Sequence, residues 1–348
     1  MFKNIFGKFS KDLGVDLGTA NTLVYVKDKG IVINEPSVVS INEKTDQIVA
    51  IGREAKVMIG KTPPHIIAIR PLTDGIVSDF EAAEKMMKHF IEKVHRETFT
   101  VMPRPRIVIS IPLGVTEVER KAVEDAALNA GARQVFLIEE PMAAAIGARL
   151  PISDPTGNMI IDIGGGTTEI AVISLGGVVT WRSIKAAGDE FNRNIISYMK
   201  ENKKLLIGEK TAEELKISIG TALESSETVT TKIKGRDLLA GLPKELEVSS
   251  QEVYHALAKS IYNIVENIKS TIEETPPELV SDIFEKGIVL SGGGALLKDF
   301  DKRIYQDTGI PTTIVDDPLT CVVRGCGLIL EDIESLKDIF AVSTHERI

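Results

Sequence analysis

The pattern of apolar and polar residues predicts short strands that alternate with amphipathic helices. Short apolar runs predict strands at residues 14–17, 22–26, 30–34, 37–41, 47–51, 106–111, 135–138, 158–163 and 287–290. Apolar residues at helical spacing predict helices at residues 79–96, 116–129, 142–149, 191–203, 212–223 and 251–272. Thr116 and Glu119 form the capping-box pattern that starts a helix. Strands that alternate with helices are typical of layered α/β proteins.

Two segments far apart in the chain repeat one pattern. Residues 15–26 read VDLGTANTLVYV, and residues 161–172 read IDIGGGTTEIAV. Asp16 matches Asp162, and glycine and threonine positions match around them. Each copy predicts an apolar strand that ends near an aspartate, a tight turn with glycine and hydroxyl residues, and a second apolar strand.

The residue types in these turns suit a nucleotide triphosphate. Glycine lets the backbone come close to a phosphate, and successive N–H groups of a tight turn form an anion-binding nest. An aspartate beside the turn can hold Mg²⁺ through its water ligands. Two ordinary hairpins would also explain the pattern, but the duplication favours a pair of phosphate-binding turns.

Two other phosphate-binding signatures fail. Gly60-Lys61-Thr62 looks like the end of a P-loop, but Ala55 stands where the first glycine is needed. No Gly-x-Gly-x-x-Gly opens a helix after the first strand, so a Rossmann dinucleotide site is unsupported.

Composition narrows the class of protein further. The 348 residues are enough for two domains, and 43% hydrophobic with 26% charged residues is ordinary for a soluble globular protein. The formal net charge of -9 argues against a nucleic-acid binder that works through a basic face. Cys321 and Cys326 are too few for a disulfide framework, so we expect two reduced thiols. No apolar run is long enough to span a membrane, and no secretory signal is visible.

The two turns, together with Gly292-Gly293-Gly294 after a strand, resemble the actin, Hsp70 and sugar-kinase superfamily. Within it, nearly the whole chain is similar to the MreB family of bacterial actin homologues. The similar segments are residues 16–22, 30–39, 69–75, 140–148, 155–168, 275–282 and 287–297. Ala187, Asn192 and Leu328 depart from residues that are common in that family.

The resemblance implies an actin-like α/β fold of two lobes, with duplicated mixed sheets, helices on both faces and a nucleotide cleft between the lobes. The first lobe would be residues 1–150, with residues 314–348 returning to it and a small subdomain at about 33–73. The second lobe would be residues 151–313, with a small subdomain at about 190–250.

The resemblance also implies ATP and Mg²⁺ as ligands, with roles for particular residues. Asp16 and Asp162 would hold hydrated Mg²⁺. The phosphates and the rest of the nucleotide would lie against Thr19, Ala20, Asn21, Gly164, Gly165, Gly166, Gly292, Gly293, Gly294 and Ala295. Glu213 and Lys216 lie one helical turn apart and would border the adenosine, although a solvated surface pair explains them equally well.

Glu140 is the candidate for orienting the attacking water. It precedes Pro141, a favoured first helical residue, so we expect Glu140 to cap a helix and to stay ionised there. An ionised carboxylate can position water for phosphoryl transfer. Thr167 would help to align that water. The alternatives are plain helix capping by Glu140 and ordinary turn bonding by Thr167.

Two segments are candidates for membrane contact. Phe2, Ile5, Phe6 and Phe9 fall at helical spacing with lysines beside them, which suits a short amphipathic segment on an anionic bilayer. A second candidate is a loop that would dip Phe99, Val101 and Met102 into the same bilayer. The alternatives are an N-terminal flap packed on its own domain and a buried loop.

The resemblance therefore implies a cytoplasmic ATPase on the inner face of the cell membrane. It would form homopolymer filaments, work with membrane proteins of cell-wall elongation, set rod cell shape and bind no nucleic acid. A small-molecule kinase of the same superfamily is the alternative, since it would share the phosphate turns. A non-catalytic structural polymer is a third possibility.

Overall fold

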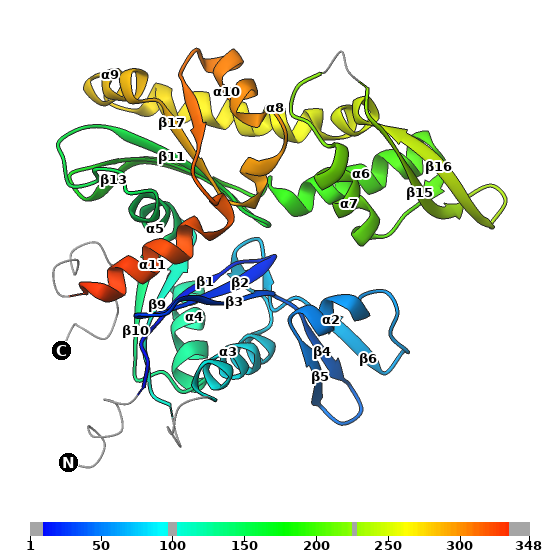
Figure 1. The fold of residues 1–348 in the computed structure, drawn as a ribbon, viewed down its shortest axis with the longest axis horizontal. Helices are drawn as coiled ribbons and strands as arrows, with labels where there is room; N and C mark the ends of the chain where they lie inside the picture. Colours follow the sequence, from blue (N-terminus) through cyan, green and yellow to red (C-terminus); the bar gives the residue numbers. More distant parts are fainter. Residues whose placement is uncertain (1–9, 97–102, 225–227, 334–348) are drawn as a thin grey trace. The chain divides into compact units, whose positions relative to one another are not determined.

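The computed structural model describes residues 10–96, 103–224 and 228–333. The chain forms two compact units (Figure 1). Unit 1 comprises Met1–Thr156, Ile173–Val178 and Leu319–Ile348, and unit 2 comprises Gly157–Val172 and Val179–Pro318. In the described ranges, every helix is too short or too polar to cross a membrane.

Unit 1 is built on a mixed five-stranded sheet with the order β10-β9-β1-β2-β3. Its strands are β1 (Leu13–Leu17), β2 (Asn21–Val26), β3 (Gly30–Pro36), β9 (Arg106–Ile111) and β10 (Gln134–Glu139). Strand β1 runs antiparallel to β2 and parallel to β9, and β9 runs parallel to β10. These strands lie where the apolar runs predict them.

Helices cover both faces of this sheet. They are α3 (Phe80–His95), α4 (Glu117–Asn129), α5 (Glu140–Gly147) and α11 (Cys321–Glu331). Val15 packs in one core with residues of α3 and α4, whereas a Cβ on the neighbouring Gly14 would touch Cys326 of α11. Because side chains alternate along a strand, α11 must cover the face opposite α3 and α4.

Side-chain caps start two of these helices, and the capping box of α4 is the one that the sequence predicts. Asp79 accepts a hydrogen bond from the Ala82 N–H at the start of α3. At the start of α4, Thr116 and Glu119 make both halves of the capping box. Helices α5 and α11 lie side by side, so close that a Cβ on Gly325 would lie 1.8 Å from the Ala143 carbonyl oxygen (Figure 1).

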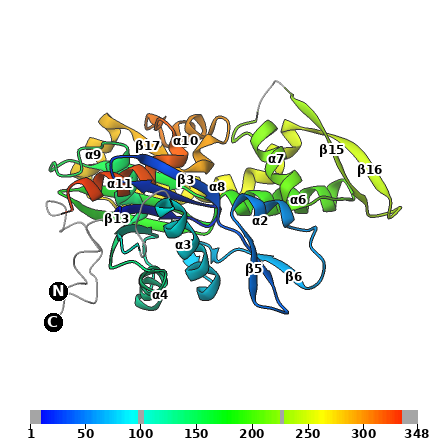
Figure 2. The ribbon, with the colours of Figure 1, turned by 60° about the horizontal axis from the view of Figure 1, so that its bottom comes forward.

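Two smaller sheets complete unit 1. The strands β4 (Val39–Asn42), β5 (Gln47–Ile51) and β6 (Ile66–Ile69) form one sheet, and α2 (Arg53–Met58) packs against it (Figure 2). The other is the hairpin of β7 (Leu72–Thr73) and β8 (Ile76–Val77). Asp74 and Gly75 both have positive φ in its two-residue turn, as an Asp-Gly hairpin turn requires.

Unit 2 repeats the design of unit 1. Its main sheet has the order β13-β12-β11-β17-β18. The strands are β11 (Asn158–Ile163), β12 (Thr168–Ser174), β13 (Gly177–Ile184), β17 (Ile288–Ser291) and β18 (Thr312–Ile314). The sheet of unit 1 has the same succession of strands when its order is written as β3-β2-β1-β9-β10. In each sheet, the third strand of this order pairs in parallel with the fourth. The duplication in the sequence therefore extends to whole sheets.

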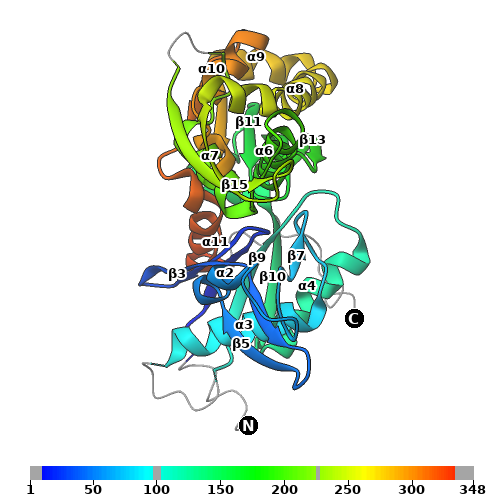
Figure 3. The same cartoon turned by 90° about the vertical axis from the view of Figure 1, so that its right-hand side faces the viewer.

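The rest of unit 2 consists of helices and a three-stranded sheet of β14 (Leu205–Leu206), β15 (Thr230–Asp237) and β16 (Pro243–Ser249). Helix α7 lies beside β15 (Figure 3). The α-helices are α6 (Gly188–Asn202), α7 (Glu209–Ile219), α8 (Ser250–Glu274), α9 (Pro277–Lys286) and α10 (Phe300–Thr308). Short 3₁₀ turns occur at Gly293–Leu296 and Pro318–Thr320.

One predicted helix ends earlier than its apolar spacing suggests. Helix α7 stops at Ile219, four residues before the predicted end. Gly220 takes an extended conformation, and the Ala222 N–H donates to the Lys298 carbonyl instead of continuing the helix. A tertiary contact thus overrides the local helical pattern.

Candidate functional site

The first repeat forms a tight turn at residues 18–20 between β1 and β2. The segment after β3 holds this turn in place. The Ser37 hydroxyl donates to the Gly18 carbonyl at 2.6 Å, and the Ser37 N–H donates to the Ala20 carbonyl at 3.0 Å. The buried Thr19 hydroxyl accepts a hydrogen bond from the Gly75 N–H at 2.8 Å. Asn21 is half-buried at the start of β2.

The second repeat forms the equivalent turn between β11 and β12. The Gly164 N–H donates to the Thr167 carbonyl at 2.9 Å across the turn. The start of α6 then packs on it, since the N–H groups of Gly188 and Asp189 donate to the carbonyls of Gly164 and Gly165. In both units, the residues that follow the third strand of the repeat fix the shape of the turn.

Lys216 reaches the second turn from α7. Its Nζ donates to the Gly188 carbonyl at 3.0 Å, directly beside Gly164 and Gly165. Both Lys216 and Glu213 are half-buried. The structure therefore brings Lys216 beside the second turn.

The glycine run after β17 packs against the strand end that carries Asp162. Gly292 has a φ of 81°, and a Cβ there would lie 2.3 Å from the Ile163 carbonyl oxygen. A Cβ on Gly294 would lie 2.2 Å from the Ile163 side chain. Ala295 is fully buried beneath this segment. Glycine is thus required at Gly292 and Gly294 for the segment to lie beside the second turn.

Asp162 is an unusual carboxylate because it is buried without a positive partner. Its Oδ1 accepts a hydrogen bond from the Ser291 hydroxyl at 2.5 Å. Burial raises the pKa of Asp162 from 3.8 to about 6, although the Ser291 hydrogen bond lowers it in part. Within the described ranges Asp162 forms no ion pair. A buried carboxylate of this kind fits a nearby cation.

Asp16 occupies the equivalent position in unit 1, but it is half-buried. The Ser110 hydroxyl lies 3.4 Å from its Oδ1. In the described part of the chain, no group of three His, Cys, Asp or Glu side chains is arranged to hold a metal ion directly. This arrangement is compatible with Mg²⁺, which often keeps its waters and binds through few carboxylates plus substrate phosphates.

Glu140 lies at the predicted helix start, but the expectation that it caps the helix is wrong. The cap residue of α5 is Glu139, and Glu140 is the first residue of the helix with Pro141 behind it. A proline is tolerated in the first turn, so the helix begins one residue earlier than expected. The Glu139 side chain makes no capping hydrogen bond, and burial raises the pKa of its carboxyl. Glu140 is buried in the first turn of the helix.

The thiol of Cys326 lies close to the same carboxylates. Burial raises the pKa of Cys326 well above its ordinary value, and the negative charges of Asp16 and Glu140 raise it further. Both carboxylates therefore lie within electrostatic reach of one buried thiol in unit 1.

The serines that accompany the two aspartates were not predicted from the sequence. A signal was available, because residues 107–110 read IVIS and residues 288–291 read IVLS. Ser37 was also missed, as was Gly188. The predicted membrane residues Phe2, Ile5, Phe6, Phe9, Phe99, Val101 and Met102 lie outside the described residues.

Comparison with known proteins points in one direction. The family model for MreB/Mbl protein matches residues 10–338. The cell shape-determining protein MreB of Escherichia coli (strain K12) is 51% identical over 338 residues, which cover 96% of this chain and 97% of the relative.

Solved structures agree with this. The crystal structure of MreB5 of Spiroplasma citri bound to ADP has a TM-score of 0.89 and 40% identity, over 95% of this chain and 98% of that one. The same protein has also been solved bound to AMPPNP. A MamK double helical filament has a TM-score of 0.79 at 22% identity, over 93% of this chain and 99% of that one, which shows the fold alone. The predicted actin-like α/β fold is thereby confirmed.

Proposed function

Because this chain belongs to the MreB/Mbl protein family, we propose that it is an actin-like cytoskeletal ATPase that binds ATP with Mg²⁺, assembles into filaments and sets cell shape. The observation that carries the proposal is the duplicated turn. Each copy places a glycine turn of fixed shape beside an aspartate, and the Spiroplasma citri relative binds ADP and AMPPNP.

The two turns are proposed to bind the phosphates of one nucleotide. Thr19, Ala20 and Asn21 would offer backbone and side-chain donors in unit 1, and Gly164, Gly165 and Gly166 would do so in unit 2. Lys216 adds a positive charge beside the second turn. The remaining nucleotide contacts are proposed for Glu213, Gly292, Gly293, Gly294 and Ala295.

Asp16 and Asp162 are proposed to hold Mg²⁺ through its water ligands. Burial of Asp162 without an ion-pair partner supports this role, because a cation nearby would offset the cost of burying the charge. When bound, the cation neutralises negative charge on the phosphate oxygens.

Glu140 is proposed to orient the attacking water, and Thr167 to help align it. A carboxylate at the first turn of a helix is favoured in its ionised form, so Glu140 can accept a hydrogen bond from water. Positioning is the main task of the protein in phosphoryl transfer, since there is little covalent chemistry for side chains to perform.

The test compares Glu140→Gln with Glu139→Gln, its neighbour in the chain. We expect Glu140→Gln to bind ATP with an affinity within about threefold of the unchanged protein and to release phosphate about 100-fold more slowly, which is the usual scale of such a contribution. Glu139→Gln should keep turnover. Loss of ATP binding in Glu140→Gln would reject the assignment, because the phosphate-binding residues lie elsewhere.

We further propose that the filaments lie on the anionic inner face of the cell membrane, where they act with membrane proteins of cell-wall elongation. Hydrogen bonds join the described residues that flank the two candidate membrane segments. The Arg104 N–H donates to the Ser10 hydroxyl at 2.8 Å, and the Lys11 N–H donates to His95 Nε2 at 3.1 Å. Ser10 and Lys11 therefore lie close to Arg104 and His95 in unit 1.

Binding of the full chain to anionic vesicles tests this part of the proposal. We expect Phe6→Glu to abolish co-sedimentation with the vesicles, because it places a charge on the apolar side of the N-terminal segment. Equal binding of Phe6→Glu and the unchanged protein would reject a role for this segment.

A further inference from the structure

Each main sheet carries a serine beside the aspartate of its repeated turn. In unit 2, the Ser291 hydroxyl donates to Asp162 Oδ1 at 2.5 Å. In unit 1, the Ser110 hydroxyl lies 3.4 Å from Asp16 Oδ1. The serine and the aspartate always come from neighbouring parallel strands, so each pair links two strands at the end of the sheet where the turn lies.

The register of the strands shows that the two pairs are equivalent. Strand β11 pairs with β17 so that Asp162 stands opposite Ser291. Strand β1 pairs with β9 up to Val15 opposite Ile109, and one further step along both strands reaches Asp16 and Ser110. The repeated sequences IVIS and IVLS occupy the same strand of each sheet. The duplicated element therefore consists of the aspartate, its turn and a serine from the next strand.

The two pairs differ in strength. Ser291 and Asp162 are both buried, and their distance of 2.5 Å is that of a short hydroxyl–carboxylate hydrogen bond. Ser110 is buried, but Asp16 is half-buried, and 3.4 Å is longer than an ordinary hydrogen bond between oxygens. Within the described residues, the Ser291 hydroxyl is the single donor to the Asp162 carboxylate.

We propose that Ser291 is a positioning residue for Mg²⁺: it fixes the Asp162 carboxylate so that the carboxylate can hold the cation's water ligands, and Ser110 is its weaker counterpart for Asp16. This inference rests on the proposed nucleotide-binding function. One carboxylate oxygen bonded to serine leaves the other oxygen free of hydrogen bonds to the described residues. Partners of this kind orient ligands, and their loss commonly lowers metal affinity by about 10-fold to 100-fold.

The experiment measures the Mg²⁺ concentration that gives half of the maximal enhancement of binding, using a fluorescent ADP analogue and the full chain. We expect the Mg²⁺ midpoint of Ser291→Ala to be at least about 10-fold higher than that of the unchanged protein. In EDTA, both proteins should bind the analogue equally tightly. Ser110→Ala should shift the midpoint by less than about threefold, because its hydrogen bond is long.

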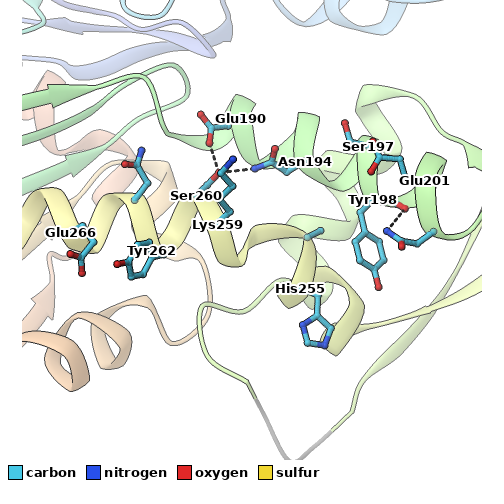
Figure 4. Close-up of a pocket in the computed structure, with 13 residues that line it drawn as sticks. Glu190, Asn194, Ser197, Tyr198, Glu201, His255, Lys259, Ser260, Tyr262 and Glu266 are labelled. Carbon is cyan, nitrogen blue, oxygen red and sulfur yellow. Dashed lines mark hydrogen bonds between the residues drawn. The ribbon is translucent and has the colours of Figure 1, made fainter.

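Ser260→Ala is the matched control. Ser260 is also a buried serine of unit 2, and its hydroxyl donates to the carboxylate of Glu190 and accepts from Asn194 Nδ2 at 2.6 Å (Figure 4). It lies in the groove between α6 and α8 and belongs to neither predicted turn. Removal of the Ser260 hydroxyl should lower thermal stability without moving the Mg²⁺ midpoint. If Ser291 were merely structural, Ser291→Ala would behave in the same way.

An Mg²⁺ midpoint within about twofold of the unchanged protein in folded Ser291→Ala would overturn the inference. Should Ser291→Ala fail to fold, Ser291→Cys keeps the shape with a weaker donor, and it should move the midpoint in the same direction. An unmoved midpoint in Ser291→Cys would then overturn the inference. If the unchanged protein itself shows no Mg²⁺-dependent nucleotide binding, the proposed function fails as well.

Discussion

Replacing Asp162 by asparagine should make the nucleotide-free protein more stable at neutral pH. The substitution keeps the size of the side chain and an oxygen that can accept the Ser291 hydrogen bond, and it removes the buried charge. Most point substitutions destabilise a protein, so a gain in stability is informative.

The magnitude follows from the pKa of the carboxyl. Burial raises the pKa of Asp162 from 3.8 to about 6, so the folded protein binds this proton more tightly than the unfolded chain does. The free energy of unfolding therefore falls as pH rises from about 4 to about 6 and stays lower above that. A difference of about two pH units corresponds to about 3 kcal/mol. The amide N–H of asparagine needs an acceptor, which reduces the expected gain to about 1–3 kcal/mol.

Urea unfolding in EDTA, followed by tryptophan fluorescence, is a suitable assay. Trp181 is the only tryptophan in the sequence, and it lies on β13 in the same unit as Asp162. We expect Asp162→Asn to unfold at higher urea than the unchanged protein at about pH 8, and we expect the two to converge at about pH 4. Binding of the Mg²⁺–nucleotide complex should be weaker in the variant.

Asp237→Asn is a control in which the pH dependence of stability has the opposite sign. Asp237 is half-buried, and a hydrogen bond from Lys244, with others from the backbone, lowers its pKa to about 2. Its ionised form is favoured by folding, so its contribution to stability is present above about pH 4 and is lost as pH falls towards 2. Equal or lower stability of Asp162→Asn at about pH 8 would refute the reasoning, because the Asp162 charge would then have to be solvated or paired.

Four other predictions concern the site and the fold. The affinity for Mg²⁺ with nucleotide, measured by fluorescence titration, should weaken as pH falls below about 6, because protons compete with the cation for Asp162. Lys216→Met should weaken ATP binding by about 10-fold in the same titration with little change in melting temperature, because a charge-assisted contact beside the turn is lost. Gly325→Ala should lower stability by about 3 kcal/mol or more in thermal unfolding, since its Cβ would overlap the Ala143 carbonyl, whereas Gly177→Ala has room and should be nearly neutral. Ser249→Ala should cost about 1 kcal/mol in urea unfolding, because it removes the capping box of α8, and an unchanged midpoint would contradict this.

Sequence reasoning located the two turns because their signal is local. Strands β9 and β11 match their predicted bounds, since continuous apolar runs end at residues that cannot continue the strand. The starts of α3 and α4 were predictable from Asp79 and Thr116, whose side chains satisfy backbone donors within the first turn.

Elements that depend on distant contacts were harder to predict. Helix α11 carries Gly325 and Gly327 and is a weak helix former, yet it forms because it packs on α5 and β1. The β15–β16 hairpin is rich in exposed charged residues such as Lys232 and Glu245, so it lacks the apolar alternation of an ordinary half-buried strand.

The partners within the site also escaped prediction for a physical reason. Ser291 meets Asp162 only because β17 pairs with β11 across 129 residues of chain, and Lys216 meets Gly188 only because α7 packs beside α6. The cap of α5 was misplaced by one residue because both Glu139 and Glu140 can start a helix before a proline.

Pelleting of the protein with parallel measurement of phosphate release tests the central claim most directly. The assay compares ATP with Mg²⁺, ATP with EDTA, and no nucleotide, and it includes Glu140→Gln. The account predicts that the unchanged protein pellets and releases phosphate only with ATP and Mg²⁺, and that Glu140→Gln pellets under the same condition without releasing phosphate. Protein that stays in the supernatant under every condition, or that assembles equally without nucleotide, would contradict it.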